Sequence, residues 1–85
     1  MNLTIVSIYR IDQNTHRGDY SNKVTMWYLD KEKAQNYVDE FAKRREAAGR
    51  SRGHGGPIYA KLYEEYALFD GERYFILGGI LSITQ

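Results

Sequence analysis

Two stretches near the start of the chain combine branched and aromatic residues with a partial two-residue alternation. Residues 3–11 predict a strand that is buried on at least one face. Residues 24–29 carry apolar groups at both odd and even positions, which predicts a second strand in the middle of a sheet. Between them, residues 12–22 are rich in Asp, Asn, Thr, Gly and Ser, whose side chains favour turns, so we expect a wide hairpin loop.

After the second strand the apolar positions recur every three or four residues, as they do on one side of a helix. Asp30 suits the N-cap, because its carboxylate can accept hydrogen bonds from the first free amides, so the helix is expected to begin at Lys31. Gly49 can take the left-handed conformation that ends a helix, which makes Ala48 the last helical residue. The apolar stripe consists of Ala34, Tyr37, Val38, Phe41 and Ala42.

The second half of the chain begins with a segment that has little to pack. Residues 50–57 contain three glycines within four positions and no strongly apolar side chain, which predicts a mobile basic loop. Residues 58–69 fit both a helical period and a strand period. We favour a strand, because Asp70-Gly71 is typical of two-residue type I′ hairpins and the β-prone residues 73–77 follow it.

That hairpin would pair Tyr66 with Phe75 and Ala67 with Tyr74. The two glycines at 78–79 then indicate a bulge, a bend or a close backbone approach before the last apolar run. The expected fold is therefore an α+β, ββαββ two-layer sandwich. It consists of an antiparallel sheet of about four strands and one amphipathic helix packed on one face.

The length of the chain limits it to one such unit. With 85 residues there is room for a single hydrophobic core, so we expect one α+β domain over residues 1–85. Its core should form where Tyr37, Val38 and Phe41 of the helix meet the apolar side chains of the sheet.

The composition excludes several classes of protein. The absence of cysteine rules out a disulfide framework, thiolate zinc sites and cysteine nucleophiles, and it suits a reducing cytoplasm. The start of the sequence has no basic leader followed by an apolar segment, and no apolar run approaches the roughly 20 residues that span a bilayer. We therefore expect a cytoplasmic protein without a membrane segment.

No constellation of residues predicts catalysis. His16 and His54 both lie in expected loops and have no second histidine in register to hold a metal ion. No serine lies in a Gly-x-Ser-x-Gly elbow, and the adjacent carboxylates of the chain project to different sides. The glycines at 53–56 lack the Lys-Ser/Thr of a phosphate-binding loop. We expect no catalytic residue, no metal ion and no cofactor, and hence no enzyme.

The strongest functional feature is a basic segment. Residues 43–54 carry five Lys or Arg and one Glu, a net charge of +4, and since the whole chain carries +1 the remainder carries −3. Arginine matches both phosphate and carboxylate, so the segment could bind nucleic acid or an acidic protein, or could be a solvated helix end. Tyrosine is abundant and is enriched in binding surfaces. The candidate binding residues are Lys43, Arg44, Arg45, Arg50, Arg52, His54, Tyr59 and Tyr63.

The element order carries a family resemblance. A short hairpin is followed by Tyr28-Leu-Asp-Lys-Glu-Lys-Ala34-Gln-Asn-Tyr37-Val, which opens an amphipathic helix, and then by a Tyr/Glu-rich strand that ends at Asp70-Gly71. This pattern resembles small bacteriophage-encoded accessory proteins, which include anti-CRISPR and other anti-defence inhibitors. The resemblance implies a stand-alone inhibitor in the host-cell cytoplasm that occupies the surface of a host or defence enzyme or nucleoprotein, without turnover.

Two further expectations concern partners. The alternative function is a small nucleic-acid-binding protein that uses the basic segment, and a loss of affinity at high salt would favour it. An exposed edge strand or the last segment, residues 80–83, would also allow a homodimer by pairing across a twofold axis.

Overall fold

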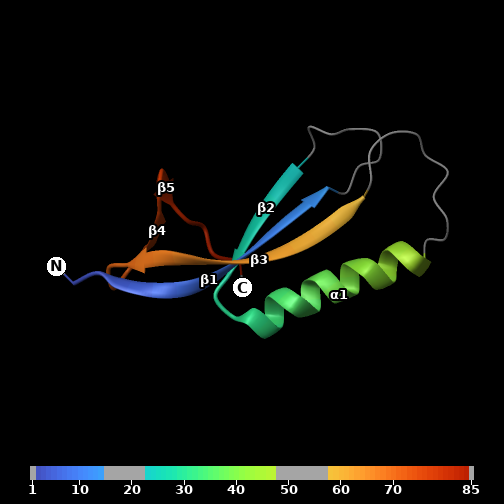
Figure 1. Ribbon diagram of the computed structural model, residues 1–85, viewed down its shortest axis with the longest axis horizontal. Helices are drawn as coiled ribbons and strands as arrows, with labels where there is room; N and C mark the ends of the chain where they lie inside the picture. The colour runs from blue at the N-terminus through green and yellow to red at the C-terminus, as the bar shows by residue number, and fades with distance from the viewer. Residues whose placement is uncertain (1, 15–22, 48–57, 85) are drawn as a thin grey trace.

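The computed structural model of the chain describes residues 2–14, 23–47 and 58–84. Within them, five strands form one antiparallel sheet in the order β2-β1-β3-β4-β5, and one helix packs against it (Figure 1). The elements are β1 (Thr4–Asn14), β2 (Lys23–Tyr28), α1 (Lys31–Ala47), β3 (Tyr59–Phe69), β4 (Tyr74–Ile76) and β5 (Gly79–Ile80). The predicted α+β class is confirmed, while the expected mobile loop at 50–57 lies outside the described residues.

The predicted count of four strands and the ββαββ order are not matched. The ambiguous segment after Pro57 is a strand, as favoured, but two further strands follow it instead of one. The chain turns at Leu77 and Gly78, so that Gly79 pairs with Ile76 and Ile80 with Phe75. Gly78 has a φ of +103°, which side chains with a Cβ rarely adopt, so the glycine pair makes a reversal and a fifth strand.

Strand β1 also runs further than predicted. Asp12, Gln13 and Asn14 were expected to begin a loop, but all three pair with β2 on one side and with β3 on the other. Pairing on both sides satisfies the backbone of these residues and outweighs their preference for turns. Thr25 Oγ1 also donates a hydrogen bond to Asp12 Oδ1 across the strands, at 3.2 Å.

The hairpin between β3 and β4 closes two residues away from the predicted register. Leu68 lies opposite Phe75 and Phe69 opposite Tyr74, so the predicted pairing of Tyr66 with Phe75 is wrong. The cause is the side chain of Asp70, whose Oδ1 accepts hydrogen bonds from the backbone N–H groups of Glu72 (2.9 Å) and Arg73 (2.8 Å). The Asp70 N–H also donates to the Arg73 carbonyl oxygen at 3.2 Å, so the turn is centred on Gly71 and Glu72, one residue later than predicted.

These hydrogen bonds give stability a dependence on pH. The backbone N–H groups of Arg73 and then Glu72 stabilise the carboxylate and hold the pKa of Asp70 below its ordinary value of 3.8. Because the folded pKa lies below the unfolded one, the contribution is present above about pH 3.8 and is lost as the pH falls through the folded pKa. We expect the stability difference between wild type and Asp70→Asn to shrink in acid. Urea unfolding near neutral pH and well below pH 3.8 tests this, and a constant difference would contradict it.

The helix covers only part of one sheet face. Its residues contact β1, β2 and β3, and Figure 1 shows α1 beneath one half of the sheet, with β4 and β5 rising at the other end. The buried cluster is Ile11, Tyr28 and Ala34, against which Tyr37 and Val38 pack as predicted. In the described part of the chain, no helix lies over the half of this face nearer the start of β1.

The C-terminal segment pairs with the outer edge of β2. Ile83 bridges to Trp27 of β2, and the Thr84 N–H donates to the Trp27 carbonyl oxygen at 2.7 Å. The chain therefore returns from β5 to β2, at the other edge of the curled sheet, so the predicted central position of this strand is wrong. By strand alternation, Ile8 and Ala67 lie on the face of the sheet opposite the helix, and both are buried there.

Candidate functional site

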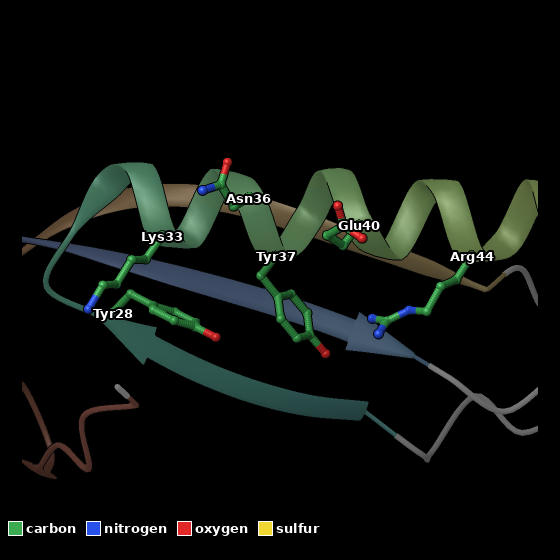
Figure 2. Close-up of a pocket in the computed structure, with 6 residues that line it drawn as sticks. All are labelled: Tyr28, Lys33, Asn36, Tyr37, Glu40 and Arg44. Atoms are coloured by element: carbon green, nitrogen blue, oxygen red, sulfur yellow. The ribbon is translucent and has the colours of Figure 1, made fainter.

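An open cleft lies between α1 and β2, with a volume of about 470 Å³. Figure 2 shows the rings of Tyr28 and Tyr37 and the guanidinium of Arg44 pointing into the space between the helix and the strand. The residues that line the cleft are Tyr28, Lys33, Asn36, Tyr37, Glu40 and Arg44. The cleft therefore combines two aromatic rings with cations from both ends of the helix.

The local sequence explains why the two tyrosines meet. Tyr28 is the last residue of β2, and the Oδ1 of Asp30 caps the helix by accepting from the Glu32 N–H at 2.9 Å, so the chain turns sharply into α1. Tyr37 then lies less than two turns into the helix, and the ring centroids are 6.3 Å apart. Burial and, secondarily, the neighbouring Tyr37 raise the pKa of Tyr28 above 10.0, so its hydroxyl stays protonated and can donate.

A buried polar network fixes the wall of the cleft. The Tyr37 hydroxyl donates to Gln13 Oε1 at 2.5 Å, and Gln13 Nε2 donates to the Met26 sulfur at 2.9 Å. The Gln13 side chain is almost fully buried, with 4% of its surface exposed. Since both polar ends of Gln13 are engaged, the Tyr37 ring is held in place before any ligand arrives.

The charges of the cleft are unevenly matched. Glu40 pairs with Lys43 at 3.7 Å, on the exposed side of the helix. Lys33 and Arg44 make no ion pair with any other described residue. Arg44 lies in the last helical turn, where the helix dipole favours a cation and holds it in position. The cleft thus presents two uncompensated cations beside two tyrosine rings and the hydroxyl donor of Tyr28, since the Tyr37 hydroxyl already donates to Gln13.

The predicted binding residues do not form one surface. Lys43, Arg44 and Arg45 are exposed on the helix, whereas Arg50, Arg52 and His54 lie outside the described residues. Tyr59 and Tyr63 pair with Asn14 and Arg10 of β1, on the sheet face that points away from the helix. The helix cations and the two predicted tyrosines are therefore on opposite sides of the sheet.

Tyr63 belongs instead to a network around Arg10. The Arg10 guanidinium lies 4.5 Å from the Tyr63 ring centroid, and its Nη1 is 2.6 Å from Glu65 Oε1. Arg10 Nε is 3.2 Å from Asp12 Oδ1, an ion pair without hydrogen-bond geometry. Because two carboxylates and a ring already surround this arginine, the network is a bridge between strands and offers little free charge to a ligand.

Of the six residues that line the cleft, only Arg44 is among the binding residues predicted from the sequence, and Tyr28, Lys33, Asn36, Tyr37 and Glu40 are not. Two of them could have been suspected from the sequence, because Tyr28 and Tyr37 lie on either side of the predicted N-cap of the helix. Which tyrosines share a cleft with the cations, however, depends on the side of the sheet that the helix covers. The alternation of β3 alone does not determine that side.

Comparison of the chain with protein-family models, with curated proteins and with solved structures finds no match. Within residues 31–47, the helix that the structure describes, no stretch is long and apolar enough to cross a membrane. Among all the described residues, no three His, Asp or Glu side chains gather in a group that could hold a metal ion.

Proposed function

We propose that the chain is a non-catalytic, phage-type binding protein that inhibits a host or defence enzyme or nucleoprotein by occupying its surface. The observation that carries this proposal is the Arg44 guanidinium, which has no ion-pair partner among the described residues, beside Tyr28 and Tyr37 in the α1–β2 cleft. The contact is an acidic segment of the partner, with a carboxylate at Arg44 and a hydrogen-bond acceptor at the Tyr28 hydroxyl.

The chemistry of the cleft supports an acidic protein partner. An arginine fork and the Tyr28 phenol donor bind carboxylates by charge-assisted hydrogen bonds, and Tyr and Arg are the residue types that dominate binding energy at protein interfaces. A nucleic-acid backbone needs a continuous cationic track. Here Glu40 lies on the cleft rim between Lys33 and Arg44, and interrupts such a track.

A charge-reversal pair tests the proposal. Arg44→Glu places a carboxylate in the cleft, whereas Lys31→Glu makes the same change in charge on the same helix, outside the cleft lining. Each protein is used as bait in a nuclease-treated bacterial lysate, and the captured enzyme is purified and assayed with and without the protein. We expect wild type and Lys31→Glu to capture and inhibit the same partner, and Arg44→Glu to lower its recovery at least tenfold.

Two other results would overturn the proposal. Equal capture by Arg44→Glu would show that the cleft is not the contact. The second result is that the bait recovers only nucleic acid, and that this recovery is lost after nuclease treatment. In that case the protein should also bind a labelled single-stranded oligonucleotide, with an affinity that falls steeply as the salt concentration rises. That result would favour the alternative function, a nucleic-acid-binding protein that uses residues 43–54.

A further inference from the structure

A row of apolar side chains crosses four strands on the part of the helix face that α1 does not cover. Ile5 lies opposite Leu68, Leu68 opposite Phe75, and Phe75 opposite Ile80, so the four side chains point to one side of the sheet. Ile5 is 71% exposed, and Leu68 and Ile80 are exposed as well. We call these four residues the apolar row.

Two more exposed side chains widen this surface. Leu3, the residue before β1, and Tyr66 of β3 flank the row, and by the alternation of the strands they share its side of the sheet. Together the six residues leave an apolar patch on the order of several hundred Å² open, a size that marks an interaction site on a monomer. The described elements place no second layer over this patch, although α1 provides one over the other half of the same face.

We propose that a second copy of this chain covers the apolar row, in a twofold-symmetric dimer. The partner's sheet would pack about 10 Å above this one, which is also the depth of a helix layer. Beside α1, the partner would complete the layer that the helix leaves unfinished. A standard interface takes about 800 Å² from each partner, so the polar residues around the patch would contribute to the contact as well.

The charges at the two ends of the patch favour a second copy. Glu64 lies beyond Tyr66 at the end nearer the helix, and Arg73 precedes Phe75 at the opposite end. Both side chains are exposed, and neither forms an ion pair among the described residues. A twofold axis that lies across the strands reverses their direction, so Glu64 of one copy meets Arg73 of the other, twice. The patch is therefore complementary to itself in charge as well as in apolar character.

Sedimentation equilibrium over a range of protein concentrations tests the dimer. Ile5→Asp puts a carboxylate into the apolar row, and because Ile5 is exposed in the monomer the variant should fold with an unchanged circular dichroism spectrum. We expect wild type to dimerise and Ile5→Asp to raise the dissociation constant at least tenfold. Val24→Asp, which replaces another exposed apolar residue outside the patch, should leave it unchanged.

A charge swap separates this geometry from other modes of self-association. Glu64→Arg and Arg73→Glu should each weaken the dimer, and the double variant should restore it, because each pair then has opposite charges again. A wild type that stays monomeric at all concentrations would overturn the proposal, as would a dimer that Ile5→Asp does not weaken or a swap without restoration. None of these measurements uses the partner of the α1–β2 cleft, so their outcome does not depend on whether the proposed function is correct.

Discussion

Replacing Ile11 by alanine is expected to lower the free energy of unfolding by about 2 to 5 kcal/mol. Ile11 has no exposed surface and lies in the buried cluster with Tyr28 and Ala34. The substitution removes buried carbons and leaves a cavity that the sheet and helix close only in part. A domain of this size has only about 5 to 15 kcal/mol of stability, so the loss should be visible as a large shift in the urea midpoint.

Ile5→Ala is the matched control. Ile5 lies on the same strand and on the same sheet face as Ile11, so the two substitutions differ only in what covers the side chain. Because Ile5 is 71% exposed, the stability of the monomer should change by less than about 0.5 kcal/mol. Both variants are measured by urea unfolding in dilute solution, where the protein is monomeric. Equal losses at the two positions would contradict the description of a helix that covers only half of the face.

The two isoleucines show how far the sequence determines the fold. The alternation in residues 3–11 predicts a strand, and Ile5 and Ile11 occupy equivalent positions within it. The packing of α1 against the sheet buries Ile11 in the core and leaves Ile5 exposed. The element types could be predicted from local pattern, whereas the extent of coverage depends on a tertiary contact.

The errors in strand ends and register have local causes that pattern does not capture. Asp70 shifts the turn of its hairpin because its side chain accepts hydrogen bonds from the backbone N–H groups of Glu72 and Arg73. Gly78 makes a full reversal where a bulge, a bend or a close backbone approach fitted equally well. Residues 12–14 stay in a strand because two neighbours pair with them, and the sequence of β1 alone gives no sign of this.

Only part of the candidate site could be predicted from the sequence. The cations of the last helical turn follow directly from the basic segment at residues 43–54. The expected tyrosine anchors, Tyr59 and Tyr63, share one face of β3 as alternation requires, but it is the face away from the helix. Which side of the sheet a helix covers is set by the handedness of its connection and by core packing, which single-strand periodicity does not report.

The polar network behind the cleft should have the second large effect on stability. In Tyr37→Phe, the Gln13 Oε1 loses the hydroxyl that donates a hydrogen bond to it. Gln13 itself stays buried, with 4% of its surface exposed. An unsatisfied buried acceptor costs about 1 to 3 kcal/mol, and we expect a loss of that size in the free energy of unfolding. Tyr66→Phe, at a tyrosine that is 67% exposed, should cost almost nothing and serves as the control.

The double variant decides whether this loss comes from the unsatisfied acceptor or from the missing hydroxyl alone. Gln13→Leu removes the acceptor, so in the Tyr37→Phe background it should recover part of the lost stability. In the wild-type background it leaves the Tyr37 hydroxyl without its acceptor and should destabilise the protein. The two substitutions should therefore couple by more than 0.5 kcal/mol in a double-mutant cycle measured by urea unfolding. Additive effects would mean that the hydroxyl reaches water in the folded state, and the cleft wall would then be less rigid than the Gln13 contacts imply.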